Sequence, residues 1–315
     1  MAARSDGSLA ALLLAQRLVE TGVPALKASE YWSLLGRVDE PAELLRGQAA
    51  SVVRDAGFDG DLAERVARLI DAATAFAFQL DELEQSGLRV VSSVDDAYPG
   101  ALVERLGDKA PPMLYVAGDP PLLGRSLLGV VGSRDVAPEG AAVATAAAEA
   151  AAQHGLGLVS GGAKGVDRLA MTAALGAGGV AVGVLAESLV RAVRDGDARR
   201  AVADEQLCFI TPYKPTAGFS VANAMGRNKL IYALSQATLV VAADREEGGT
   251  WAGATEALRI GSAPVLVWSG PGGGPGNAAL IERGGIAVSD VEEMFPLPAA
   301  EQVSEPSQRQ LSLDV

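Results

Sequence analysis

Between residues 125 and 270 the chain alternates short apolar segments with longer helical patterns, and this alternation most narrows the possible folds. The short segments are almost entirely apolar and most are bordered by glycine, which is typical of parallel strands covered on both faces of a sheet. We therefore predict an α/β domain with a Rossmann-like, doubly wound, mostly parallel sheet. The predicted strands are LLGVVG (127–132), GLGLVS (155–160), GVAVGVL (179–185), QLCFI (206–210), ATLVVAA (237–243) and APVLVW (263–268).

The remainder of the chain follows other patterns. Residues 1–80 show helical patterns only, including a helix in which Asp61 is the expected N-cap. The segment 81–124 contains a short strand, a short helix and an extended, proline-bounded stretch. We expect four parts: a small all-helical N-terminal domain (1–80), a connector (81–124), the Rossmann-like domain (125–295) and a polar, mobile tail (296–315).

The charge balance argues against a broad basic surface. The chain carries 26 basic and 39 acidic side chains, a formal net charge of −13, whereas proteins that coat duplex DNA present an extended positive face. A nucleic-acid site here must therefore be local. The single cysteine, Cys208, allows no intrachain disulfide, and no segment has the length and apolarity of a membrane span. We expect a cytoplasmic protein without a membrane partner.

Four polar or glycine-rich segments follow predicted strands or open the helix after one. In an open α/β sheet the ligand side is the carboxyl end of the strands, so all four segments should gather at one edge. A single glycine-rich turn of this kind is as readily explained by plain strand-to-helix geometry as by ligand binding. Four together favour a site. The segments are GSRDVAPEG (132–140), SGGAKGVD (160–167), GRNK (226–229) and DREEGGTWAGATEA (244–257).

The residue types in these segments suit a phosphate group. Free N–H groups at a helix N-terminus attract anions, glycine lets an anion approach the backbone, and arginine grips phosphate with two N–H groups. Asp167 caps its helix on one interpretation, and orients Lys164 or meets a sugar hydroxyl on another. The candidate contacts are the glycines Gly161, Gly162 and Gly165, the cations Arg134, Lys164, Arg227 and Lys229, and the donors Ser133, Ser160 and Asn228.

Other chemistry-bearing residues have simpler explanations. His154, the only histidine, precedes a glycine where a helix should end, so we interpret it as a C-cap or dipole partner. One histidine in that place builds no Ser-His-Asp set, and no metal-ligand spacing is present. Trp251 is expected to pack in the core, with base stacking as the alternative. We predict no cofactor and no metal, and a binding protein rather than an enzyme.

Five segments together resemble the DNA-processing protein A (DprA/Smf) family, in order and in spacing. The resemblance is carried by VVGSR, LVSGGAKGVDRLAMTAAL, VAVGVLAESL and GRNKLIYALSQATLVVAA, and by the approach segment DDAYPGALVERLGDKAPPMLYVAGD. It implies an extended Rossmann fold behind a small SAM-like helical domain, single-stranded DNA binding, a homodimer, and loading of RecA during recombination or natural transformation. The DNA contacts carried over by motif are Gly132, Ser133, Arg134, Ser160, Gly161, Lys164, Gly165, Asp167, Arg227, Asn228 and Lys229.

The same superfamily, which joins the Smf/DprA proteins to lysine-decarboxylase-like phosphoribohydrolases (LOG proteins), offers an alternative. The segment GGTWAGATE loosely resembles the glycine-rich loop of the hydrolases, and on that interpretation Glu256 would assist cleavage of a bound nucleotide. A nucleotide-sensing protein without turnover is a variant of this alternative. This chain also departs from the DprA pattern at Met171, where the family usually has histidine, and at Lys229, where it has a second arginine.

Overall fold

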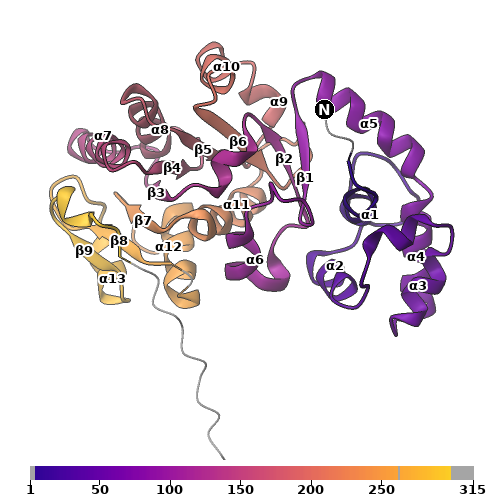
Figure 1. The fold of residues 1–315 in the computed structure, drawn as a ribbon. Coiled ribbons are helices and arrows are strands. Elements are labelled where there is room, and N and C mark those ends of the chain that lie inside the picture. The colour runs from indigo at the N-terminus through magenta and orange to yellow at the C-terminus, as the bar shows by residue number, and fades with distance from the viewer. Residues whose placement is uncertain (1–3, 262, 299–315) are drawn as a thin grey trace, which may run out of the picture.

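The structure is a computed structural model in which residues 4–261 and 263–298 of the 315 are described. A group of helices lies beside a sheet that carries helices on both faces (Figure 1). Within the described ranges, no helix has both the length and the apolarity needed to cross a bilayer. Most of the predicted mobile tail, from residue 299 onward, lies outside the described residues.

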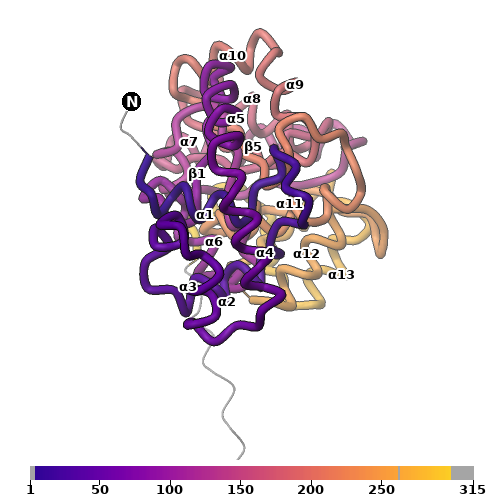
Figure 2. Tube along the Cα trace, turned by 90° about the vertical axis from the view of Figure 1, so that its right-hand side faces the viewer, coloured from indigo at the N-terminus to yellow at the C-terminus, as the bar shows by residue number. Residues whose placement is uncertain are grey.

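The N-terminal part is helical, as predicted, and packs around one buried helix. Leu12, Leu13 and Leu14 of that helix are fully buried, since a helix that is apolar on every side is stable only inside a core. Figure 2 shows these helices as a layer in front of the sheet. The N-cap of the fourth helix is Asp59, whose carboxylate accepts from Leu62 N at 2.8 Å, and not the predicted Asp61. The helices are α1 (Asp6–Ala15), α2 (Ala28–Leu35), α3 (Ala49–Asp55), α4 (Gly60–Ile70) and α5 (Ala73–Gln85), with the 3-10 helix η1 (Pro41–Leu45).

Two aromatic side chains of α2 fix this helical part to the residues that follow it. The Tyr31 hydroxyl lies 2.6 Å from Ser93 Oγ, and Trp32 Nε1 donates to the Ala110 carbonyl at 2.8 Å. Each aromatic ring thus has its apolar body packed and its polar atom satisfied, as buried Tyr and Trp require. The helical part and the connector are therefore joined by specific contacts as well as by the chain.

The strands of the described residues form one nine-stranded sheet of order β1-β2-β6-β5-β4-β3-β7-β8-β9. The six predicted strands are all present and mutually parallel, from β6 to β8 in that order. The predicted connector also joins the sheet, because β1 and β2 pair antiparallel with each other and β2 with β6. The strands are β1 (Arg89–Ser92), β2 (Met113–Ala117), β3 (Leu127–Val131), β4 (Gly157–Ser160), β5 (Ala181–Val184), β6 (Leu207–Thr211), β7 (Ala237–Val240), β8 (Val265–Trp268) and β9 (Ile286–Val288).

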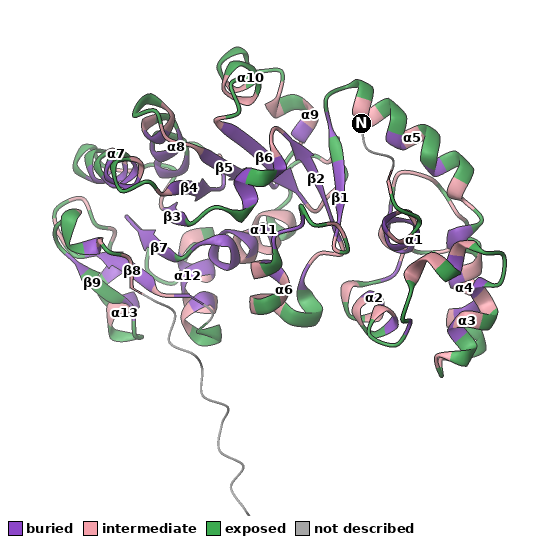
Figure 3. Cartoon of the chain, viewed as in Figure 1, coloured by how far each residue is buried: buried purple, intermediate pink, exposed green. Residues whose placement is uncertain are grey.

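Helices cover both faces of this sheet, which explains why its central strands are almost entirely apolar and are buried (Figure 3). One face carries α7 (Pro138–Gln153), α8 (Val166–Gly176), α9 (Leu189–Ala192) and α10 (Gly196–Ala203) (Figure 1). The other carries α6 (Gly100–Leu106), α11 (Val221–Leu234), α12 (Gly248–Ile260) and α13 (Asn277–Glu282). The remaining short helices are η2 (Gly107–Lys109), η3 (Pro120–Gly124) and η4 (Glu292–Met294).

The strand order reverses between β3 and β7, because the chain proceeds from β3 to β6 in one direction and then from β7 to β9 in the other. In doubly wound sheets ligands bind outside the carboxyl ends of the strands at such a switch point. The loops that follow β3, β4 and β7 all lie there. The topology therefore places three of the four sequence motifs at the expected ligand edge.

Arg105 on α6 joins the connector to the Rossmann-like part through hydrogen bonds. Its guanidinium donates to the Ala233 carbonyl at 3.1 Å and to the Ser235 carbonyl, at the end of α11. These are carbonyls without a partner inside the helix. We expect Arg105→Ala to lower the free energy of unfolding by about 1.5–3 kcal/mol, as measured by urea denaturation. Removal of the exposed neighbour, in Glu104→Ala, is the control, and equal urea midpoints for the two variants would contradict the assignment.

Candidate nucleic-acid interface

The loop after β3 and the turn after β4 are in direct contact. Gly165 has a positive φ of 85°, and a Cβ there would overlap the carbonyl oxygens of Ser133 and Arg134. Val166 N donates to the Ser133 carbonyl at 3.2 Å, and a Cβ on Gly132 would come within 2.6 Å of the Val166 side chain. The two motifs thus form one surface, and glycine at 132 and 165 is required for their close approach.

The turn 161–165 presents unpaired backbone donors at the start of α8. In the described part of the chain, the N–H groups of Gly162, Lys164 and Gly165 have no hydrogen-bond acceptor. A helix N-terminus carries a partial positive charge, and N–H groups without a partner there are ready to bind an anion. The positive φ of Gly162, 66°, belongs to the same turn. The backbone alone therefore provides an anion-binding surface.

Two of the predicted cations lie exposed beside this turn. Arg134 places its guanidinium 5.2 Å from the centre of the Phe219 ring, and Lys164 Nζ lies 3.2 Å from Asp135 Oδ1. Both partners of the second pair are largely exposed, at 78% and 88% of the side chain. An ion pair in water at that exposure contributes little, so a phosphate competes with Asp135 for Lys164 at small cost.

Three other predicted contacts lie beneath the turn instead of on it. Ser160 is fully buried and its hydroxyl donates to the Val130 carbonyl at 2.6 Å. Arg227 is 7% exposed, and its Nη2 lies 3.5 Å from Asp167 Oδ2. The guanidinium lies directly against Gly161, since any Cβ at that position would overlap it. The geometry thus gives these side chains a supporting place under the backbone that would meet an anion.

Arg227 and Asp167 form a buried ion pair, and both burial and the pairing affect the pKa of Asp167. Burial raises the pKa of the Asp167 carboxyl above its ordinary value, and the charge of Arg227 works against that rise. Arg227 Nε and the hydroxyl of nearby Tyr232 are buried without a hydrogen-bond partner among the described residues. A carboxylate in this place would repel phosphate, so its neutralisation by Arg227 is a condition for an anion site above it.

The side chains of the GRNK segment diverge. Asn228 Nδ2 donates to the Gly249 carbonyl at 2.9 Å, and Lys229 Nζ lies 3.1 Å from Glu256 Oε1. Consecutive residues of an α-helix point about 100° apart, so residues 227, 228 and 229 of α11 face three different neighbours. The structure gathers Arg134 and Lys164 at the turn, and it directs Asn228 and Lys229 towards α12.

Sequence reasoning missed Phe219, which lies in the loop between β6 and α11 and is 51% exposed. An aromatic residue between Gly218 and Ser220, in the loop before α11, was the available signal. Trp251, by contrast, is 7% exposed and has Arg283 over its ring at 4.8 Å, so it packs. His154 is the C-cap of α7, as predicted. Within residues 4–261 and 263–298, no cluster of His, Cys, Asp or Glu has the makings of a metal site.

The sequence is similar to one protein family and to curated proteins from two bacteria. The sequence profile of the family described as "DNA recombination-mediator protein A" matches residues 89–297. Protein Smf of Escherichia coli (strain K12) is 29% identical over 218 residues, which are 68% of this chain and 57% of Smf. A putative DNA processing protein DprA of Mycobacterium tuberculosis is 30% identical over 263 residues, 76% of this chain and 63% of that protein. The chain thus spans about three fifths of the length of these curated relatives.

Two solved structures share the fold. DNA processing protein A from Streptococcus pneumoniae superposes with a TM-score of 0.62 at 23% identity, covering 85% of this chain and 97% of its own. DNA processing protein A from Helicobacter pylori superposes with a TM-score of 0.54 at 21% identity, covering 66% of this chain and 93% of its own. That structure concerns the single-stranded DNA binding mode of the Helicobacter pylori protein. At these identities the similarity establishes the fold, and the residues of the site have to be argued from this chain.

Proposed function

Because the chain belongs to the DNA recombination-mediator protein A family, we propose that it binds single-stranded DNA in DNA processing, with backbone phosphate held on the turn 161–165. The proposal rests on one observation: the N–H groups of Gly162, Lys164 and Gly165, in the turn before α8, have no acceptor among the described residues, and the exposed cations Arg134 and Lys164 lie beside them. Phosphate is the anion that a nucleic-acid strand presents at every step.

The residues at the edge then divide into three roles. Arg134 and Lys164 supply charge to the phosphates, and Phe219, with half of its surface exposed, offers a face on which a base can stack. Asp167 and Arg227 hold the turn from beneath. Such a site is small and local, so it is compatible with a formal net charge of −13, and its affinity should fall steeply with salt.

Two further properties that the family implies belong to the same proposal. A homodimer would present two such turns to one strand, and hand-over of the strand to RecA would place the protein in recombination or natural transformation. A cytoplasmic location follows from these roles.

The alternative of a nucleotide-cleaving enzyme requires Glu256 beside the phosphate. Glu256 instead pairs with Lys229, which lies two residues beyond Arg227 and hence on another face of α11. We therefore propose a binding function without turnover.

Binding of a fluorescent 20-residue oligothymidylate over a salt series tests the proposal. Each phosphate contact with a single strand contributes about 0.7 to the slope of log affinity against log salt. Arg134→Ala and Lys164→Ala should each lower the slope by about 0.7 and the affinity about fivefold at 0.1 M salt.

Two matched variants complete the test. Asp135→Asn removes the carboxylate next to Lys164 and should strengthen binding, whereas Arg259→Ala removes an exposed cation from the far end of α12 and should leave binding unchanged. The proposed function is wrong if the protein does not bind the strand, and this site is wrong if both alanine variants retain the salt slope of the wild type.

A further inference from the structure

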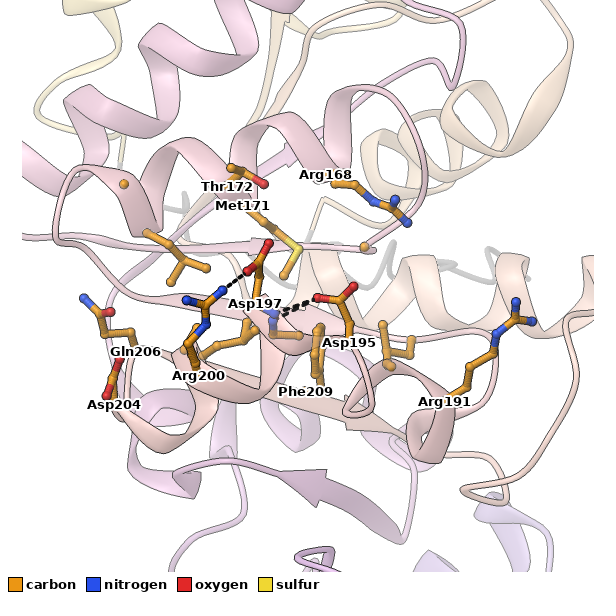
Figure 4. A pocket seen from close by; sticks show the side chains of 18 of the residues that line it. Arg168, Met171, Thr172, Arg191, Asp195, Asp197, Arg200, Asp204, Gln206 and Phe209 are labelled. Atoms are coloured by element: carbon orange, nitrogen blue, oxygen red, sulfur yellow. Dashed lines mark hydrogen bonds and ion pairs between the residues drawn. The ribbon is translucent and has the colours of Figure 1, made fainter.

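A groove runs along the sheet face between α8 and the pair α9 and α10, and apart from Gly162 its lining residues have no part in the proposed function. Its volume is about 1130 Å³, slightly above the ~300–1,000 Å³ of most small-molecule sites. Figure 4 shows one wall formed by α8 and the other by α9 and α10. Gly162 of the phosphate-binding turn is part of its lining, so the groove and the turn share a residue.

The floor of the groove is apolar. It includes Met171 of α8, Leu185 after β5 and Phe209 of β6. α9 and α10 are short helices of 4 and 8 residues, and the groove lies between them and α8. A flat, weakly polar group gains from contact with such a floor because it leaves water.

The charges of the groove are unevenly placed. Arg168 of α8 and Arg191 of α9 stand on opposite walls at the same end (Figure 4), and neither is paired with a carboxylate in the described residues. Glu187 also lines the groove. Gly162, whose N–H has no acceptor among the described residues, lines the same groove as the two arginines.

The acidic groups farther along the groove limit what it can hold. Asp197 is paired with Arg200, and Asp195 caps α10 by accepting from two backbone N–H groups. Asp204 lies at the opposite end from the two arginines (Figure 4) and would repel a second phosphate. The groove thus fits a ligand with one anionic end and one flat, neutral end.

We propose that this groove holds one nucleotide unit, with its phosphate between Gly162, Arg168 and Arg191 and its sugar and base on the floor of Met171, Leu185 and Phe209. The proposal rests on the proposed function, since it extends the ligand of the turn by one unit. The nucleotide belongs either to a bound strand or to a free nucleoside monophosphate, which share this chemistry.

Methionine methyl NMR tests the proposal directly. The chain has five methionines, and Met171→Leu assigns the signal of Met171. Addition of thymidine monophosphate or of the 20-residue oligothymidylate should shift this signal. A shift with both ligands places a unit of the strand in the groove, and a shift with the monophosphate alone places a free nucleotide there.

Filling the groove provides the second measurement. Thr172 lines the groove and is exposed on α8, so Thr172→Trp should obstruct the groove. The control, Ala146→Trp, also introduces a tryptophan, but on the exposed side of α7. We expect Thr172→Trp to weaken binding of the ligand that shifts Met171 at least tenfold, and Arg191→Ala to weaken it about fivefold, with Ala146→Trp unchanged.

The outcomes separate the two proposals. A Met171 signal that neither ligand moves, in a protein that still binds the oligothymidylate in a salt-dependent way, overturns the groove and leaves the turn intact. Unchanged affinity in Thr172→Trp, with the fold verified by thermal denaturation, also overturns it. Absence of any strand binding by the wild type is the failure of the proposed function itself.

Discussion

Substitution of Arg227 by methionine should lower the free energy of unfolding by about 3–5 kcal/mol at neutral pH. The guanidinium is 7% exposed and is the partner of the equally buried Asp167. Without it the carboxylate keeps its desolvation penalty and loses its compensating charge, which costs more than the pair contributes. Chemical denaturation of wild type and variant, monitored by circular dichroism, measures the difference.

The loss should depend on pH in a defined direction. Burial raises the pKa of Asp167 in the folded protein, and removal of Arg227 raises it further, while the unfolded value stays near 3.9. The folded variant therefore binds more protons than the unfolded chain between these two pKa values, and its stability falls as the pH rises through that window. We expect the deficit relative to wild type to be largest at pH 7 and to shrink towards pH 4.

A double variant separates this electrostatic cost from simple loss of packing. Arg227→Met with Asp167→Leu removes both charges from the buried site, and replacement of a whole buried pair by apolar residues is often close to neutral. The double variant should recover most of the stability lost by Arg227→Met and should show no such pH dependence. If it is as unstable as the single variant at every pH, the role assigned to the pair is wrong.

Periodicity was sufficient to predict most of the sheet. The alanine-rich segment between the strands at 127–132 and 155–160 forms the helix α7 (Pro138–Gln153), which a proline begins and which ends shortly before a glycine. β2 (Met113–Ala117) was interpreted as part of a connector, since prolines lie on both sides of it, yet it is buried along its whole length and pairs on both edges. Antiparallel additions to a parallel sheet leave no alternating signal when both faces are covered.

The candidate site was predicted less completely, for a geometric reason. The strand ends identified which loops meet, and Gly165 against Ser133 confirms that two of them touch. The side chains that face the ligand depend on the rotation of α11 about its axis, and the apolar pattern of α11 is too uniform to reveal that rotation. In the structure Arg227 pairs with Asp167 in the interior, and Lys229 pairs with Glu256. Burial of a charged residue by a partner distant in sequence is a tertiary effect, invisible to a local motif.

The close approach of the two loops at Gly165 gives the largest expected effect on binding. Alanine at this position would have both an unfavourable positive φ and a Cβ inside the carbonyl oxygens of Ser133 and Arg134. The turn must then move, and the N–H groups of Gly162, Lys164 and Gly165 move with it. A hydrogen bond to a charged group contributes about 1.5–3 kcal/mol, so we expect Gly165→Ala to weaken strand binding about 10- to 100-fold.

Gly178 supplies the matched control, because it has a similar positive φ of 77° but open space where a Cβ would stand. It follows the other end of α8, away from the turn. Gly178→Ala should therefore cost about 1–2 kcal/mol of stability for the left-handed backbone and leave strand affinity unchanged. Measured side by side, a loss of affinity in both variants would trace the effect to general destabilisation of α8, whereas a loss confined to Gly165→Ala assigns it to contact between the two loops.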